Sequence, residues 1–411
     1  MNILIISTSD IHGGAAIASY RLLTALHTQG VKAKMLVRDK FSDNPHVIKV
    51  GNALQDKWNF YSERATIFIH NRFSRKNLFD ISIANTGVSV VDLPEFQEAD
   101  VIHLHWINQG MLSIEEIGKI VASGKKVVWA MHDMWSFTGI CHHAGSCIRY
   151  ENECGLCPFL GARSEKDLST IAFQKKQIAY SKGNISFVAC SEWLRKLAKK
   201  SPLTQGHPVL SIPNPIDTEE FHPKNKTEIR KRLNFPIDKK IVLFATVKAS
   251  DTRKGVNYLV ESSRLLKTQC DDLLFVIAGN KGSEIAKQLA LPSIELGFVS
   301  PEKMVDLYNA SDVFVTPSLQ ENLPNTIMEA MACGTPCVGF DIGGIPEMID
   351  HRINGYVAEY KNAEDFATGI CWVLFEMDTE RLSKEARKKV LDLYSQERIV
   401  EQYKKVYGYG E

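Results

Sequence analysis

Two segments of the sequence carry residues suited to binding phosphate and sugar hydroxyls. Gly13 and Gly14 join a first apolar strand to a helix, where a ligand can approach the backbone and the helix N-terminus faces an anion. Glu321 and Glu329 stand on either side of Pro324, which suits the first turn of a helix, and their carboxylates can accept bonds from sugar or ribose hydroxyls. The alternatives are a turn that needs glycine for its geometry alone and a capped helix with solvated glutamates.

A third segment, residues 248–255, is basic. Lys248, Arg253 and Lys254 follow an apolar strand and can neutralise a diphosphate whose negative charge grows as its bond to a sugar breaks. An ordinary basic surface loop is the alternative. The spacing around Gly13 is not G-x-G-x-x-G and the chain has no GxxxxGK[ST] motif, which argues against a dinucleotide oxidoreductase and a P-loop protein.

The elements that position these segments alternate between short apolar strands and helices. The strands lack polar alternation, which indicates parallel strands covered by helices on both faces, hence a doubly wound α/β fold. The expected strands are 2–8, 33–37, 101–104, 126–131 and 185–190, then 241–247, 273–279, 294–296, 312–316 and 337–340. Pro213 and Pro215 stiffen the chain between the two series, so two domains with a boundary near residue 215 are predicted.

Further motifs give these segments a family resemblance. They follow one another in the order Gly297-Phe298-Val299, Pro317-Ser318, the Glu321/Glu329 pair, Ala330-Met331-Ala332-Cys333-Gly334-Thr335-Pro336, Gly343-Gly344-Ile345-Pro346-Glu347 and Asn354-Gly355. The sequence resembles glycosyltransferase family 4, the retaining transferases with the GT-B fold. The resemblance implies two Rossmann-like domains facing an inter-domain cleft: an acceptor domain over residues 1–215, a nucleotide-sugar donor domain over 216–392, and a helix over 393–411 that packs back on the N-terminal domain.

The resemblance also implies roles for residues of the donor domain. Lys254 and Lys248 would bind the donor diphosphate, although the family usually has Arg where this chain has Lys248, and Arg253 could substitute for it. Glu329 would hold the nucleotide ribose and Glu321 would lie near the donor sugar ring. Backbone amides around the start of the following helix would contact phosphate, those of Leu323, Asn325 and Thr326.

In the N-terminal domain, His132 looks like the active-site histidine of the family, which lies beside the donor sugar. It follows an expected strand, at the edge of the sheet where ligands collect, and Asp133 could orient it. An isolated histidine in such a position is otherwise more often structural. Gly13 and Gly14 look like the glycine loop that the family places beside the phosphates and the acceptor.

By the same resemblance, the reaction transfers a sugar from a nucleotide-sugar, most readily a UDP- or GDP-sugar, to a hydroxyl of a glycan or lipid-linked acceptor with the anomeric configuration retained. Such transfer builds cell-surface polysaccharides or glycolipids. The catalytic residues would be His132, Lys254 and Glu321, and no catalytic cofactor is expected because cationic groups take the place of a metal. A nucleotide-sugar 2-epimerase on the same fold and a non-catalytic nucleotide-sugar scaffold are the alternatives.

A cysteine-rich insert over residues 141–157 follows His132. Cys141, Cys147, Cys154 and Cys157 have the spacing C-x5-C-x6-C-x2-C, which can close a tetrahedral site. The spacing predicts a structural zinc site that stiffens the insert. Free thiols packed in a loop, or two disulfides in an oxidising compartment, are the alternatives.

Residues 56–79 mix six aromatic with five basic side chains. Such a face could lie on an anionic membrane or bind a lipid-diphosphate acceptor, and the excess of basic residues in the N-terminal half agrees with this. An amphipathic helix that packs its aromatic residues on the core is the alternative. The segment lacks the features of a nucleic-acid site. The sequence shows no membrane-spanning run and no signal peptide, so a cytoplasmic protein, peripheral on the inner face of the membrane, is expected.

Overall fold

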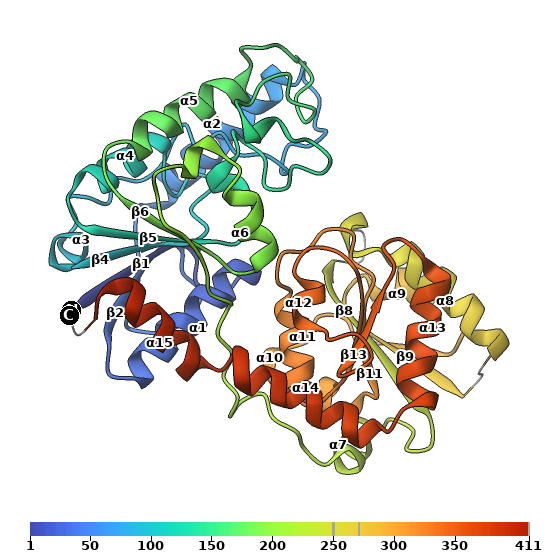
Figure 1. Ribbon diagram of the computed structural model, residues 1–411. Helices are drawn as coiled ribbons and strands as arrows, with labels where there is room; N and C mark the ends of the chain where they lie inside the picture. The colour runs from blue at the N-terminus through green and yellow to red at the C-terminus, as the bar shows by residue number, and fades with distance from the viewer. Residues whose placement is uncertain (249–250, 270–271, 410–411) are drawn as a thin grey trace. The chain divides into compact units, whose positions relative to one another are not determined.

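The computed structural model describes residues 1–248, 251–269 and 272–409, except for the side chain of Lys248. These residues divide into two compact units, Met1–Pro215 with Ile399–Glu411, and Ile216–Arg398. We call them unit 1 and unit 2 and describe each by itself (Figure 1).

Unit 1 contains a seven-stranded parallel sheet in the order β3-β2-β1-β4-β5-β6-β7. Its central strands carry apolar residues on both faces because both faces are covered: Leu4 and Ile6 of β1 join one buried cluster, and Ile3 and Ile5 join another. The strands are β1 (Asn2–Ser9), β2 (Lys32–Asp39), β3 (Val47–Lys49), β4 (Val101–Leu104), β5 (Lys126–Met131), β6 (Ile185–Ala189) and β7 (Val209–Ser211).

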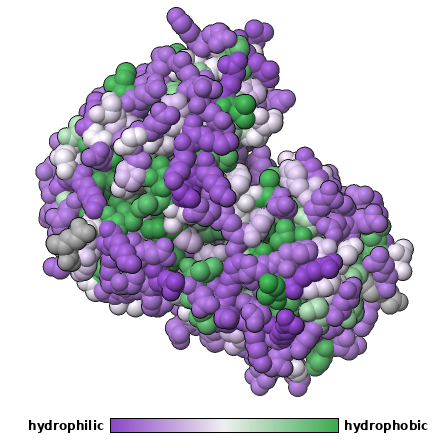
Figure 2. Space-filling model, in the orientation of Figure 1, coloured by the Kyte–Doolittle hydropathy of each residue, from purple (hydrophilic) through white to green (hydrophobic). Residues whose placement is uncertain are grey.

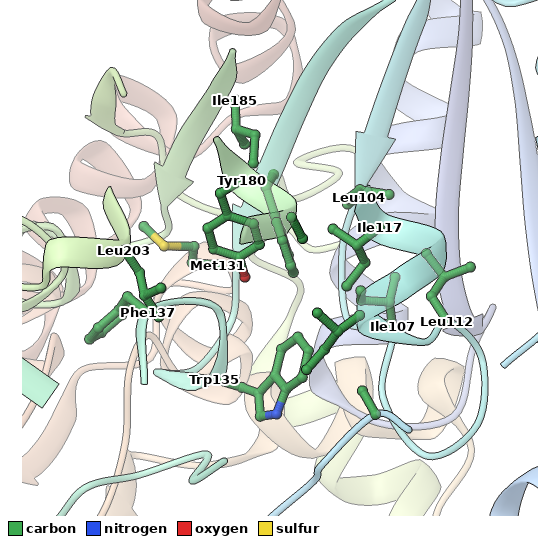
Figure 3. Close-up of a cluster of buried hydrophobic side chains, with 14 of the residues drawn as sticks. Leu104, Ile107, Leu112, Ile117, Met131, Trp135, Phe137, Tyr180, Ile185 and Leu203 are labelled. Atoms are coloured by element: carbon green, nitrogen blue, oxygen red, sulfur yellow. The ribbon is translucent and has the colours of Figure 1, made fainter. Parts of the chain in front are cut away.

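Helices cover both faces of this sheet (Figure 1). The larger of the two apolar clusters brings Leu104, Met131 and Ile185 of the strands against Ile117 of α4 and Tyr180 of α5 (Figure 3). The helices are α1 (Gly14–Thr28), α2 (Ala53–His70), α3 (Pro94–Glu98), α4 (Ile114–Ala122), α5 (Leu168–Tyr180), α6 (Glu192–Ala198) and α15 (Gln396–Tyr407), with short turns η1 (Trp135–Phe137), η2 (Arg149–Glu151) and η3 (Pro202–Thr204).

The last helix, α15, belongs to unit 1 from Ile399 onwards, although it follows unit 2 in the chain. Ile399, Val400, Tyr403 and Tyr407 are buried in the same cluster as Ile3 and its neighbours. The prediction that the C-terminal helix crosses back to the N-terminal domain is therefore confirmed.

Unit 2 repeats the architecture with a six-stranded parallel sheet in the order β10-β9-β8-β11-β12-β13. Its strands are β8 (Lys240–Lys248), β9 (Leu273–Asn280), β10 (Ser293–Glu295), β11 (Val313–Thr316), β12 (Cys337–Phe340) and β13 (Gly355–Ala358). Its helices are α7 (Lys226–Leu233), η4 (Thr252–Lys254), α8 (Val256–Gln269), α9 (Gly282–Ala286), α10 (Pro301–Ala310), α11 (Asn325–Ala332), α12 (Ile345–Met348), α13 (Ala363–Cys371), η5 (Trp372–Glu376) and α14 (Thr379–Leu393). The doubly wound α/β prediction is confirmed for both units.

Each sheet reverses its strand order next to its first strand, between β1 and β4 in unit 1 and between β8 and β11 in unit 2. In open parallel sheets, ligands bind beyond the carboxyl ends of the strands at this point. Hydrophilic residues cover most of the surface seen in Figure 2. Within the described part of the chain, no helix is both long and apolar enough to cross a membrane.

Candidate active site

Lys254 and Glu321 meet beyond the carboxyl ends of β8 and β11. Lys254 is the last residue of η4, which follows β8, and Glu321 lies in the loop after β11. Lys254 Nζ forms a salt bridge with Glu321 Oε1, and both side chains are partly buried. The two loops are also joined through the backbone, because the Leu319 amide donates to the Arg253 carbonyl at 2.7 Å. The structure therefore brings together two of the three residues predicted to be catalytic.

The other cations predicted in this loop are placed differently. The Arg253 guanidinium turns back to Asp251, with Nη2 2.8 Å from Oδ2 and Nε 2.9 Å from Oδ1. Burial raises the pKa of Asp251, but the hydrogen bonds and charge of Arg253 outweigh it and lower that pKa below its ordinary value. The Lys248 side chain lies outside the described residues. In this arrangement Arg253 fixes the loop that presents Lys254.

Glu329 lies buried in the middle of α11. The Tyr308 hydroxyl, from α10, donates to Glu329 Oε2 at 2.8 Å and thereby orients the carboxylate. Pro324 precedes the helix, so the amides of Asn325 and Thr326 belong to its first turn, the part of a helix whose N–H groups are available to an anion. Leu323 is buried just ahead of this turn. The oriented Glu329 carboxylate can accept hydrogen bonds from ribose hydroxyls, and the first turn of the same helix can bind a phosphate.

Gly343, in the loop after β12, lets that loop pack closely against the loop that carries Glu321. Gly343 has a φ of 60°, and a Cβ atom at this position would lie 1.8 Å from the carbonyl oxygen of Glu321. The next residue, Gly344, donates its amide to the Asn322 carbonyl at 2.7 Å. Only glycine permits this approach, so the loop after β12 sets the position of the Glu321 backbone.

The glycine loop of unit 1 is anchored by a buried carboxylate. Gly13 precedes α1 with a φ of 104°, a backbone conformation that favours glycine, and Gly14 is the first residue of the helix. Asp10, fully buried, accepts the amides of Phe41 at 3.1 Å and Ser42 at 2.8 Å, which joins the loops after β1 and β2. Burial raises the pKa of Asp10, but these hydrogen bonds outweigh it and lower the pKa.

His132, at the carboxyl end of β5, is hydrogen bonded to a second histidine. Its Nε2 lies 2.9 Å from Nδ1 of His105, which follows β4. His105 Nε2 has no hydrogen-bond partner among the described residues. A buried lone pair is tolerated better than a buried unpaired N–H, so we infer that His105 carries its proton on Nδ1 and donates it to His132. The proton of His132 is then on Nδ1.

A third histidine and the last helix extend this group into the core. The His103 ring lies 4.4 Å from the His105 ring at an interplanar angle of 48°, and its Nδ1 lies 2.8 Å from the Tyr407 hydroxyl of α15. Burial lowers the pKa of His132 to about 4, against the opposing charge of Asp133, and burial lowers the pKa of His103 to about 3. These rings are therefore neutral at pH 7. Sequence reasoning missed His103 and His105, although their H-x-H spacing at the end of a strand was a usable signal.

Asp133 organises the loop that follows His132. Its Oδ2 accepts from Trp106 Nε1 at 2.9 Å and from His142 Nδ1 at 2.7 Å, and its Oδ1 accepts from the Trp135 amide at 2.8 Å. Burial raises its pKa, but the charge and hydrogen bond of His142 outweigh it and lower the pKa to about 2. Asp133 acts on His132 through its charge, and the hydrogen bond to His132 described above comes from His105.

A buried lysine that the sequence did not single out supports the same loop. Lys176 of α5 donates from Nζ to the carbonyls of Trp135 at 2.5 Å and Thr138 at 3.0 Å. The ammonium also lies 3.3 Å from the centre of the Trp135 ring. Burial lowers the pKa of Lys176 to about 7. This side chain fixes the turn η1 between the β5 strand and the cysteine-rich insert.

The cysteine-rich insert places its four thiols around one small cavity, lined by Cys141, Cys147, Cys154 and Cys157 together with neighbours such as Tyr150. All four are free cysteines, and burial raises the pKa of Cys154 to about 11 and that of Cys157 to about 12. In the described residues, no group of three or more His, Cys, Asp or Glu side chains is arranged to hold a metal ion. The zinc site stays a prediction from the spacing.

Comparison with known proteins shows what the chain is similar to. The model of the family "Glycosyl transferases group 1" matches residues 225–389. An uncharacterized glycosyltransferase of Methanocaldococcus jannaschii, MJ1607, is 26% identical over 361 residues, which cover 81% of this chain and 90% of the relative. The Escherichia coli UDP-Gal:alpha-D-GlcNAc-diphosphoundecaprenol alpha-1,3-galactosyltransferase is 21% identical over 347 residues, 81% of each chain. Several further relatives match over only about half of their own length.

A solved structure agrees with this at the level of the fold. Anabaena Alr3699/HepE, solved in complex with UDP and glucose, superposes with a TM-score of 0.65 over 99% of both chains at 15% sequence identity. The matched region 225–389 contains Lys254, Glu321 and Glu329. The two doubly wound units and these matches identify the chain as a glycosyltransferase with the GT-B fold, whose residues 225–389 match the glycosyl transferases group 1 family.

Proposed function

We propose that the protein is a retaining glycosyltransferase that moves a sugar from a nucleoside-diphosphate sugar to a hydroxyl of a glycan or lipid-linked acceptor. The observation that carries this proposal is the meeting of Lys254 and Glu321 beyond the carboxyl ends of β8 and β11, at the point where the strand order reverses. A UDP- or GDP-sugar is the proposed donor. The E. coli relative is named for UDP-Gal, and HepE was solved with UDP, which supports the first of these.

In the proposed reaction the protein works by charge and position. The bond between the anomeric carbon and the diphosphate oxygen breaks, the acceptor oxygen bonds to that carbon on the same face, and the acceptor proton passes to the departing diphosphate. Lys254, Lys248 and the first turn of α11 are proposed to stabilise the growing negative charge. Because these groups supply positive charge, we propose a transfer that needs no catalytic metal.

The remaining site residues are proposed to hold the donor. Glu329, oriented by Tyr308, accepts from the ribose hydroxyls. When the donor binds, the Lys254 ammonium pairs with the diphosphate. Glu321 then loses its salt bridge with Lys254 and contacts the sugar instead. His132, held by His105, is proposed to contact the donor sugar, and the Gly13–Gly14 turn is proposed to contact the acceptor.

The proposed location of the protein in the cell depends on its acceptor. A lipid-linked acceptor would bring the protein to the inner face of the cell membrane as a peripheral, cytoplasmic enzyme, and its product would enter cell-surface polysaccharide or glycolipid. The relatives described above are glycosyltransferases, which gives no support to a 2-epimerase or a non-catalytic scaffold.

The test is a turnover assay with UDP-glucose, UDP-galactose, UDP-N-acetylglucosamine and GDP-mannose against glycan and lipid-diphosphate acceptors. We expect acceptor-dependent release of the nucleoside diphosphate, an NMR spectrum in which the product keeps the donor's anomeric configuration, and loss of turnover in Lys254→Ala. Lys287→Ala, an exposed lysine of the same unit, is the matched control and should stay active. Altered free sugar without an acceptor would indicate the epimerase, and an inverted product would contradict retention.

A further inference from the structure

Helix α2 exposes an apolar stripe, whereas its buried side carries the polar residues Asn59, Glu63 and Arg64 together with Ile67. Leu54, Trp58, Tyr61 and Ile69 lie on one side at helical spacing and are exposed, Trp58 by 71% and Tyr61 by 65%. A helix on the surface of a domain ordinarily has the opposite arrangement. The aromatic residues of this helix were expected either on a membrane or packed on the core, and the exposure of Trp58 and Tyr61 contradicts the second possibility for these two rings.

The buried polar side chains of α2 hold the segment that follows the helix. Glu63, fully buried, accepts the amides of Ile83 at 2.7 Å and Ala84 at 2.8 Å and pairs with Arg64 at 2.7 Å. Arg64 in turn donates to the Ile81 carbonyl at 3.0 Å. These contacts orient the helix, and with it the apolar stripe that faces away from them.

The segment after the helix adds exposed aromatic and basic residues. Arg72 and Phe73 both have a left-handed backbone, with φ of 55° and 61°, which is uncommon for such bulky side chains. The Phe73 amide donates to the Phe68 carbonyl at 2.9 Å, yet the Phe73 ring is 70% exposed. Phe79 is exposed as well. The backbone is thus held in an unfavourable conformation that keeps an aromatic ring and a cation on the surface.

The charge on this surface is mostly positive. Lys57, Arg72, Arg75 and Lys76 are exposed. Of the carboxylates nearby, Glu63 is buried and paired with Arg64, Asp56 is half-buried and paired with Lys49, and only Asp80 is exposed. Tryptophan and tyrosine rings next to lysine and arginine are typical of surfaces that lie in the headgroup region of a bilayer. Protein interfaces, by contrast, are depleted in lysine.

We propose that the exposed stripe of α2 together with residues 72–79, which we call the α2 surface, docks the protein on an anionic lipid bilayer. The rings enter the interface and the four cations bind lipid phosphates. Figure 1 shows α2 and the chain after it at one end of unit 1. The proposal names the surface that would bring the enzyme to a lipid-linked acceptor, but it holds or fails without the proposed reaction, because docking is measured in the absence of donor.

The experiment is flotation of the full-length protein with vesicles of phosphatidylglycerol and phosphatidylcholine, and with phosphatidylcholine alone. We expect binding to the anionic vesicles that weakens with salt and is much lower on phosphatidylcholine. Replacing Arg72, Arg75 and Lys76 by Gln should weaken the partition on the order of 100-fold. Replacing Trp58 and Phe73 by Ser should weaken it on the order of tenfold for each ring.

Matched controls lie in unit 2. Lys231, Lys287 and Lys303 are exposed and serve for the charge change, and Phe298, which is 76% exposed, serves for the aromatic change. These variants should bind vesicles like the wild type. Circular dichroism and thermal unfolding confirm that each variant is folded. No flotation on anionic vesicles, or equal loss in the α2-surface and control variants, would overturn the proposal, and so would binding to an acidic protein but not to vesicles.

Discussion

Replacing Asp133 by Asn tests how the loop beside His132 is held. In the folded protein, burial raises the pKa of Asp133, but the charge and hydrogen bond of His142 and the Trp135 amide outweigh it and lower the pKa to about 2, against an ordinary 3.8. This difference corresponds to about 2 kcal/mol of unfolding free energy, because each pKa unit is worth about 1.4 kcal/mol.

The sign of the effect sets its pH dependence. The folded protein binds the proton less readily than the unfolded chain, so the contribution is present in full above about pH 4 and is lost as the pH falls towards 2. Asparagine cannot ionise. We therefore expect Asp133→Asn to be about 2 kcal/mol less stable than the wild type at pH 7, and the difference to shrink in acid.

Urea denaturation followed by tryptophan fluorescence measures this difference, since Trp106 and Trp135 contact the Asp133 carboxylate directly. Asp92→Asn, at an exposed position of the same unit, is the control and should change the unfolding free energy by less than about 0.5 kcal/mol. The reasoning is refuted if Asp133→Asn matches the wild type at pH 7, or if its deficit is as large near pH 3 as at pH 7.

Three further substitutions have expected outcomes. Tyr308→Phe removes the hydroxyl that donates to Glu329 and should cost about 1.5–3 kcal/mol of unfolding free energy, measured by urea denaturation; an unchanged value would contradict the contact. His105→Phe should lower kcat on the order of 10-fold to 100-fold with little change in the donor KM, because His132 loses its hydrogen bond, and kinetics that match the wild type would show that His105 does not position it. Lys176 has a pKa lowered by burial to about 7, so the wild type should gain up to about 1.4 kcal/mol per pH unit relative to Lys176→Met between pH 7 and 10, and parallel stability curves would contradict this.

The fold was accessible from the sequence because most strands are long apolar runs. Lys126–Met131 is an example, since it is buried on both faces and the predicted bounds agree with β5. The strands that the sequence did not reveal are β3, β7 and β13, which have three or four residues and lie at the ends of the two sheets. An edge strand of this length has too few apolar residues to form a recognisable run.

The candidate site was accessible only in part. Residues that follow strands, such as Lys254, Glu321 and His132, could be named because parallel strands carry ligand sites at their carboxyl ends. Their partners could not: Tyr308 reaches Glu329 from another helix, and His105 reaches His132 from the neighbouring strand. Such contacts depend on how elements pack in three dimensions, which the spacing along the chain does not encode.

Binding of nucleotide-sugars tests the central claim most directly. Thermal-shift measurements with UDP-, GDP-, ADP- and TDP-sugars should find a ligand that raises the melting temperature of the wild type and of Lys287→Ala. The same ligand should have a much smaller effect on Lys254→Ala and Glu329→Ala, because these side chains are proposed to hold its diphosphate and ribose. If no nucleotide-sugar stabilises the wild type, or if both site variants respond as the wild type does, the donor site does not lie at Lys254 and Glu329.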